Sequence, residues 1–203
     1  MTAEVFTIGH SSHTIEAFID LLHLHAITGL ADVRSSPYSR MCPQFNREQF
    51  KAVLEKHNIA YVFLGKELGA RSEQSECYKN GKVQFDILAR QPLFLKGLDR
   101  VMNGMEKYRI TLMCAEKDPI SCHRTILVSR QLHNRGIVVK HIHYDGSIET
   151  HSQVEKRLLE NLNMEERDLF RSEKEILDEA YIKWGDRIAY EEHSLVNENL
   201  EES

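Results

Sequence analysis

The sequence predicts an α/β fold of three-layer, Rossmann-like type: a mostly parallel five-stranded sheet with helices on both faces. Short, β-prone apolar runs alternate along the chain with segments whose apolar residues recur at helical spacing. Strand–helix alternation of this kind is typical of parallel sheets that are covered on both faces. With 203 residues, of which 41% are hydrophobic and 28% charged, the chain is long enough for one domain with a full core.

The apolar runs place the strands at residues 5–10, 27–33, 60–64, 110–113 and 137–144. Helices are expected from residue 15 after an N-cap at Thr14, over 47–57 after Asn46, over most of 85–108 with a break or a helix start at Pro92, and over 152–162. The stretch 65–84 has three glycines and no regular period. Loops of that length in compact domains are usually functional or disordered.

The charge distribution divides the chain into a single α/β domain, residues 1–162, and an acidic helical C-terminal extension, residues 163–203. The extension carries 13 acidic and five basic residues, a balance of −8, whereas the whole chain is at −5, so residues 1–162 are at +3. Such a segment is usually a solvated surface. Alternatively, it folds over a basic face of the domain and competes with an anionic ligand.

Composition excludes several classes of protein. Four cysteines do not form a disulfide framework, and the N-terminus has no basic leader region, so we expect a cytoplasmic protein with reduced thiols. No apolar run approaches the roughly 20 residues that span a bilayer, so no membrane contact is expected. The chain has no Gly-x-Gly-x-x-Gly, no P-loop and no aromatic-rich basic stripe. We therefore predict no cofactor, and nucleic acid is only weakly supported as a partner. The sequence does not predict an oligomeric state.

The most informative segment, residues 110–124, contains a strand, a polar loop and the start of a helix. Ser121 is the expected N-cap, which would put Cys122, His123 and Arg124 in the first helical turn. Free amides and the positive end of the helix dipole favour anions there and lower the pKa of a thiol.

Polar and reactive residues also follow other predicted strands. In open parallel sheets, ligands bind at the carboxyl ends of the strands. The strand-end residues are His10, Ser11, Asp32, Arg34, Gly65, Cys114 and Glu116. We therefore expect them to share one crevice with the helix start at Cys122.

The same positions resemble a known family. Five motifs match the DUF488 family in order: Thr7-Ile-Gly-His-Ser11; Asp32-Val-Arg34 with Pro37 and Ser39; Phe45; the pairs Leu64-Gly65 and Leu68-Gly69; and Cys114-Ala-Glu116 followed by Cys122-His-Arg124. The resemblance covers residues 5 to about 145. It implies an α/β fold with a site at these strand ends, but no reaction, because the activity of the family is unassigned.

The candidate catalytic residues are Cys114, Glu116, Cys122, His123 and His10. The cysteines are candidate nucleophiles, and Glu116 is a candidate general base or nucleophile if burial raises its pKa. His10 is a candidate acid or base. The alternatives are ordinary buried packing for Cys114 and a backbone hydrogen bond for His10.

The candidate substrate-binding residues are Ser11, Asp32, Arg34, Arg40 and Arg124. Guanidinium groups near a helix N-terminus match the oxygens of phosphate, which predicts a small anionic or nucleotide-like ligand. The alternative is that the carboxylates pair with the arginines and brace the crevice.

These residues favour an enzyme that acts on a phosphorylated or nucleotide-like substrate. A second interpretation is a rhodanese-like, thiol-dependent transferase or a redox sensor. A third is a non-catalytic module that binds nucleic acid or a protein through the mildly basic body. No metal site is predicted, because Cys114 and Cys122 are eight residues apart, whereas zinc ligands are usually two to four apart.

Overall fold

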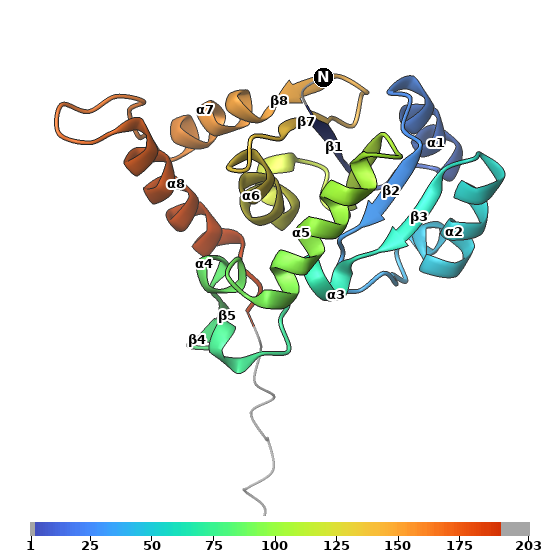
Figure 1. Ribbon diagram of the computed structural model, residues 1–203, viewed down its shortest axis with the longest axis horizontal. Helices are drawn as coiled ribbons and strands as arrows, with labels where there is room; N and C mark the ends of the chain where they lie inside the picture. The colour runs from blue at the N-terminus through green and yellow to red at the C-terminus, as the bar shows by residue number, and fades with distance from the viewer. Residues whose placement is uncertain (1–2, 192–203) are drawn as a thin grey trace, which may run out of the picture.

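The structure is a computed structural model that describes residues 3–191, and its mixed α/β fold is built on a six-stranded, mostly parallel sheet (Figure 1). The strands are β1 (Glu4–Gly9), β2 (Gly29–Asp32), β3 (Ala60–Phe63), β6 (Ile110–Cys114), β7 (Val138–Ile142) and β8 (Ile148–Thr150). Their order across the sheet is β3-β2-β6-β1-β7-β8. Only β8 is antiparallel to its neighbour.

The prediction of five strands was therefore wrong by one. The five parallel strands lie where the apolar runs placed them, and β8 is added at the edge after a turn at Gly146, whose φ is +86°. None of the three residues of β8 is buried. No apolar run therefore marks this strand in the sequence.

Helices follow most of the strands. Within residues 3–191 the α-helices are α1 (Ile15–Leu24), α2 (Arg47–Lys56), α3 (Gly65–Leu68), α4 (Phe85–Leu88), α5 (Pro92–Met105), α6 (Arg130–His133), α7 (His151–Asn161) and α8 (Glu173–Ile188). Short 3₁₀ turns cover Pro43–Phe45, Ser75–Cys77 and Pro119–Ser121, and Arg124–Ser129 is π-helical. None of the helices in this part of the chain is long and apolar enough to cross a membrane.

Successive residues of β1 enter two separate cores, because side chains alternate between the faces of a strand. Phe6 and Ile8 pack with α1 and α2 through side chains such as Phe18 and Phe50. Val5 belongs to the other core, which contains apolar residues of α5 and α6. Helices therefore cover both sets of strand side chains.

The helix after β6 begins differently from the prediction. Ser121 is not its N-cap; it ends a 3₁₀ turn that is capped by the carboxylate of Asp118. Cys122 follows with an extended backbone (φ −135°, ψ 140°), and its carbonyl accepts hydrogen bonds from Thr125 and Ile126. Cys122 therefore occupies the cap position, immediately before the helix rather than in its first turn.

The stretch 65–84 contains more regular structure than its composition suggests. A second, two-stranded sheet contains β4 (Tyr78–Lys79) and β5 (Lys82–Val83). Asn80 (φ +52°) and Gly81 (φ +76°) form its turn, as in hairpins whose two central residues have positive φ. An isolated bridge joins Lys82 to Glu191, so the chain after α8 lies beside this hairpin.

The predicted acidic extension contains α8. A capping box starts this helix, in which Ser172 and Glu175 each accept a backbone hydrogen bond from the other. Ile176 of α8 shares a buried core with Ile126. Residues 192–203 of the predicted extension lie outside the described residues.

Candidate functional site

A cavity of about 660 Å³ lies at the carboxyl ends of β1, β2 and β6. Its polar lining includes six serines, namely Ser11, Ser12, Ser35, Ser36, Ser39 and Ser121. Six residues that the sequence proposed for a site also line it, namely His10, Ser11, Arg34, Cys114, Glu116 and His123. The fold thus brings residues from three strand ends to one cavity.

The register of the sheet explains this convergence. Gly9 pairs with Cys114, and the His10 N–H donates to the Cys114 carbonyl at 2.9 Å. A side chain at position 9 would clash, because its Cβ would lie 1.8 Å from the Glu116 carbonyl oxygen. On the other side of β6, the Val33 N–H donates to that strand at 3.0 Å. The ends of β1 and β2 are therefore fixed on either side of β6.

Five of the proposed site residues do not line the cavity, and one of them is Gly65, which is buried at the start of α3. Asp32 and Arg124 are fully buried, and Cys122 is only 1% exposed. Arg40 is exposed on the surface, outside the lining.

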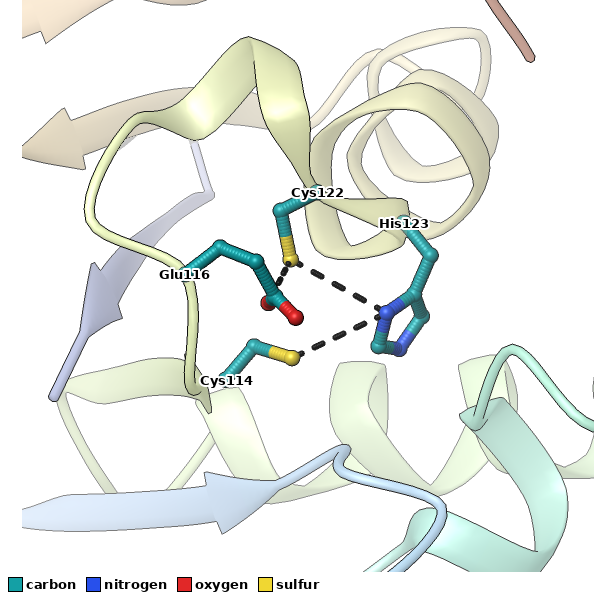
Figure 2. Close-up of side chains that lie close together, drawn as sticks. All are labelled: Cys114, Glu116, Cys122 and His123. Atoms are coloured by element: carbon teal, nitrogen blue, oxygen red, sulfur yellow. Dashed lines mark hydrogen bonds between the residues drawn. The ribbon is translucent and has the colours of Figure 1, made fainter. Parts of the chain in front are cut away.

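Cys114, Glu116, Cys122 and His123, which we call the thiol cluster, lie close together at the cavity wall (Figure 2). Cys122 Sγ and Glu116 Oε2 are hydrogen-bonded at 2.8 Å. His123 Nδ1 lies 3.7 Å from Cys114 Sγ and 3.9 Å from Cys122 Sγ, and its Nε2 lies 3.0 Å from the Val33 carbonyl. All four potential ligand atoms lie within 4.8 Å of one another. Such a group can exchange protons, hold a thiolate or bind a soft metal cation.

The two thiols of the cluster have opposite pKa shifts. Burial raises the pKa of Cys114 well above its ordinary value, and the neighbouring Cys122 adds to this rise. Burial would also raise the pKa of Cys122, but the hydrogen bond with Cys114 and the charges of Arg124 and His123 lower it well below the ordinary value. Cys122 is therefore the thiolate of the pair, and Cys114 keeps its proton.

The other two members respond to this thiolate. Burial would lower the pKa of His123, but its hydrogen bond and charge attraction to Cys122 raise it. The Glu116 side chain is exposed to the cavity, yet the protein behind it removes water, and this desolvation and the charge of Cys122 raise its pKa. The Cys122 sulfur and the Glu116 carboxyl group lie 2.8 Å apart and share one proton.

An ion pair closes the β2 side of the cavity. Arg34 donates from Nη2 and Nε to Asp32 at 2.7 and 3.0 Å, and the Tyr61 hydroxyl donates to the same carboxylate at 2.9 Å. Arg34 Nη1 lies 3.3 Å from His10 Nε2. Burial lowers the pKa of His10 to about 4, so the ring is neutral at pH 7, donates from Nδ1 to the Ser11 carbonyl and accepts from Arg34.

Arg124 lies behind the thiol cluster and not in the cavity. Its Nη1 donates to the Glu116 carbonyl at 2.7 Å, and its backbone N–H donates to Cys122 Sγ at 3.4 Å. Its Nε has no hydrogen-bond partner among the described residues. Arg124 therefore braces the loop before Cys122 through a backbone carbonyl, rather than through a carboxylate as the sequence suggested.

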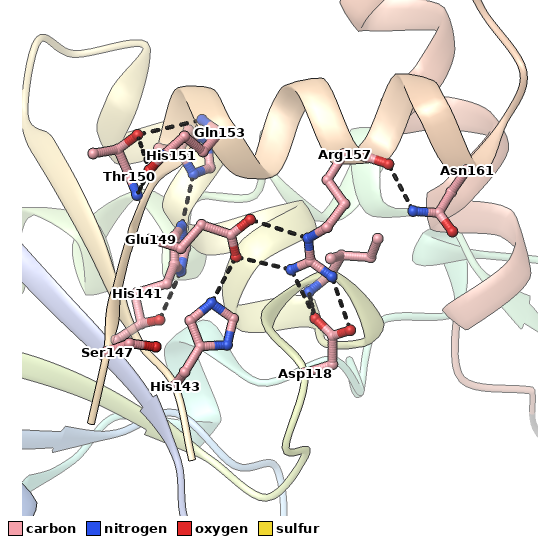
Figure 3. A network of polar contacts seen from close by, with 12 residues as sticks. Asp118, His141, His143, Ser147, Glu149, Thr150, His151, Gln153, Arg157 and Asn161 are labelled. Carbon is pink, nitrogen blue, oxygen red and sulfur yellow. Dashed lines mark hydrogen bonds and ion pairs between the residues drawn. The ribbon is translucent and has the colours of Figure 1, made fainter. Parts of the chain in front are cut away.

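A second polar network holds the same loop from α7 (Figure 3). Arg157 donates two hydrogen bonds to Asp118, both 2.9 Å, and two to Glu149, at 3.0 and 2.9 Å. His143 Nε2 lies 2.8 Å from Glu149. Because Asp118 also caps the turn before Cys122, the network links the loop conformation to α7.

The family model described as Domain of unknown function DUF488 matches residues 14–131, which is more than half of the chain. The chain belongs to the DUF488 family. No curated protein and no solved structure matches it. The match confirms the family resemblance of the sequence motifs. It includes Arg34 and the whole thiol cluster, whereas His10 and Ser11 precede it.

The DUF488 cavity also has a wall that the sequence did not predict. Arg71 lines it beside Tyr190, whose ring centroid lies 4.1 Å from the guanidinium carbon. The Tyr190 carbonyl accepts a hydrogen bond from Val83 at 3.0 Å, so the hairpin of β4 and β5 holds this wall in place. Tyr190 lies beyond the DUF488 match, and no local pattern marks either residue. The sequence signals were the length of the stretch 65–84 and the alternative that residues 163–203 fold over a basic face of the domain.

Proposed function

We propose that this DUF488 protein is an enzyme whose thiol cluster acts on a small anionic ligand, phosphorylated or nucleotide-like, held in the adjoining cavity. One observation carries the proposal: two thiols, a carboxyl group and an imidazole converge at the wall of a polar cavity of about 660 Å³. Small-molecule sites usually occupy roughly 300–1,000 Å³, and perturbed pKa values concentrate at functional sites. We interpret the fold as three-layer and Rossmann-like, a class that binds ligands at this edge.

The lining supports an anionic ligand. Arg71 and Arg34 contribute cations, and six serine hydroxyls can donate hydrogen bonds. Asp32 already matches the charge of Arg34, so Arg71 is expected to contribute most of the charge recognition. The raised pKa of Glu116 reduces its repulsion of an anion, because a protonated carboxyl group has no charge.

The cluster divides the reacting roles among its members. Cys114 and Glu116 border the cavity, whereas Cys122 lies behind them and carries the negative charge next to His123. Cys114 is hydrogen-bonded to Cys122 and keeps its proton, so the Cys114 thiol can donate a hydrogen bond in the cavity, and the Cys122 thiolate is the candidate nucleophile. Glu116 is the general acid, because a carboxyl group with a raised pKa can donate a proton near neutral pH.

Calorimetric titration with adenosine monophosphate and with inorganic phosphate tests this function. Arg71→Ala should weaken binding roughly 10- to 100-fold, the equivalent of about 1.5–3 kcal/mol for a hydrogen bond to a charged group. Arg40→Ala is the matched control, because Arg40 is exposed and outside the lining, and it should bind as the wild type does. No binding of either ligand by the wild type, or equal effects of the two variants, contradicts the proposal. A steep loss of affinity with salt would instead indicate a nucleic-acid surface.

A rhodanese-like, thiol-dependent transferase or a redox sensor is the second candidate. Its support is the lowered pKa of Cys122 beside a second thiol, because thiolates are the reactive and oxidisable form. Such thiols require a reducing compartment, so we place the protein in the cytoplasm. Mass spectrometry after peroxide treatment should find a Cys114–Cys122 disulfide if this candidate holds. Oxidation of Cys42 alone, a partly exposed cysteine of the same cavity, excludes it.

A further inference from the structure

The geometry points to a zinc site: we propose that Cys114, Glu116, Cys122 and His123 bind one zinc ion at the cavity wall. This inference goes beyond the function proposed above, because a zinc ion would take the two thiols and Glu116 as ligands in place of their roles as nucleophile and acid. It stands on the ligand geometry whether or not the anionic ligand is correct. The sequence argued against zinc because Cys114 and Cys122 are eight residues apart. The 3₁₀ turn at Pro119–Ser121 and the cap position of Cys122 bring the two thiols to one point.

The distances fit a tetrahedral ion. Zinc lies about 2.3 Å from sulfur and about 2.0–2.1 Å from nitrogen, so a tetrahedral site separates its sulfur and nitrogen ligands by about 3.6 Å. The His123 Nδ1 atom lies 3.7 Å from Cys114 Sγ and 3.9 Å from Cys122 Sγ. The contact of Cys122 Sγ with Glu116 Oε2, 2.8 Å, is shorter than such a site allows. Rotation of the exposed Glu116 side chain would lengthen it.

The surroundings orient the ligands as zinc sites do. The Val33 carbonyl accepts the Nε2–H of His123 at 3.0 Å, which leaves the lone pair of Nδ1 facing the two thiols. The Arg124 N–H donates to Cys122 Sγ at 3.4 Å, as it would to a metal-bound thiolate. Zinc with two thiolates and one carboxylate would carry a single negative charge, and the buried guanidinium of Arg124 would neutralise it.

The ligand types select the metal. Two thiolates and an imidazole suit zinc, whereas calcium and magnesium prefer oxygen ligands alone. Cys114, Glu116 and His123 border the cavity. Cys114, Cys122 and His123 can hold the ion while Glu116 is replaced by water or by an oxygen of the substrate, an exchange typical of catalytic zinc sites.

Metal titration of the full chain tests the site. Reduced, chelator-treated protein should bind one equivalent of zinc, measured by competition with a chromophoric chelator. Cobalt should give the visible bands of a tetrahedral ion with a thiolate-to-metal charge-transfer band. Cys122→Ser should weaken zinc binding at least 100-fold, whereas Cys42→Ser should change it less than twofold, because Cys42 borders the cavity outside the cluster.

Each outcome decides for or against the site. Less than half an equivalent of bound zinc, a cobalt spectrum without thiolate bands, or equal affinities of the two cysteine variants overturns the inference. If Cys122→Ser does not fold, the wild-type cobalt spectrum decides: thiolate-to-metal charge-transfer bands of a tetrahedral ion support the site, and their absence overturns it. Arg71→Ala should bind zinc as the wild type does. If the wild type binds zinc but neither phosphate nor adenosine monophosphate, the proposed function is refuted and the zinc site stands.

Discussion

Replacing Arg124 with methionine separates the support of the loop from the electrostatics of the thiol cluster. The guanidinium is fully buried and donates to the Glu116 carbonyl at 2.7 Å. A hydrogen bond from a charged group contributes about 1.5–3 kcal/mol, and losing it leaves a buried carbonyl unpaired. Methionine fills most of the volume and removes a buried charge, which offsets part of the loss. We therefore expect the free energy of unfolding to fall by about 2 kcal/mol.

The same substitution should raise the pKa of Cys122. Burial raises that pKa, and Arg124 is one of the groups that outweigh burial, so its removal shifts the balance back towards the thiol. The folded pKa of Cys122 lies below the value of about 8.5 for a free thiol, so the stability it contributes is complete above pH 8.5 and is lost as the pH falls through the folded pKa. The stability difference between wild type and variant should therefore be largest at alkaline pH and shrink in acid.

Urea denaturation at several pH values and the ultraviolet absorbance of the thiolate in metal-free protein measure both effects. Arg130→Met is the matched control. Arg130 follows Arg124 in the same helical segment and pairs with Asp178 of α8, and it is not among the groups that shift the pKa of Cys122. It should lower stability without moving the thiol titration. If Arg124→Met leaves that titration unchanged, or if the wild-type Cys122 titrates near pH 8.5, our account of the cluster is refuted.

Three further predictions follow from the same contacts. Gly9→Ala should lower the free energy of unfolding by about 3 kcal/mol, because the added Cβ would lie 1.8 Å from the Glu116 carbonyl oxygen. Urea denaturation measures this loss, and a loss below about 1 kcal/mol would show that the loop at Glu116 moves to accommodate the methyl group. Arg157→Ala should cost about 1–2 kcal/mol in the same assay and loosen the loop that Asp118 caps, seen as faster amide exchange there. His10 has a folded pKa of about 4 against about 6.5 unfolded, so the unfolded state binds its proton first and stability should fall between pH 6.5 and 4; His10→Gln should flatten this slope.

Each of these has an internal control. Gly136→Ala meets no atom within 4 Å, so it should cost only the strain of its φ of +79°. Lys156→Ala, next to Arg157 on α7, removes an exposed pair and should change stability by less than about 0.5 kcal/mol. If His10→Gln keeps the wild-type pH slope, the loss of stability in acid comes from other buried histidines, such as His141 and His151, and not from His10.

The central sheet and the identity of the reactive residues follow from the sequence alone. Each parallel strand is an apolar run that must be buried, and its position is a local property of the chain. Parallel order brings the carboxyl ends of the strands to one edge, so His10, Arg34 and Cys114 could be assigned to one place before any contact was known. β8 escaped this reasoning because none of its residues is buried and its pairing depends on a turn.

Only the tertiary structure decided what each reactive residue does at that edge. Whether Arg124 faces a ligand or a carbonyl depends on the loop that packs around it, and a local pattern does not encode that packing. The thiol cluster forms because Asp118 caps a 3₁₀ turn and the cap of the following helix lies at Cys122 instead of Ser121, a displacement of one residue that the helical period does not resolve. Arg71 and Tyr190 are about 120 residues apart in the chain, and they meet because the segment after α8 pairs with a hairpin through backbone hydrogen bonds, which carry no side-chain signal.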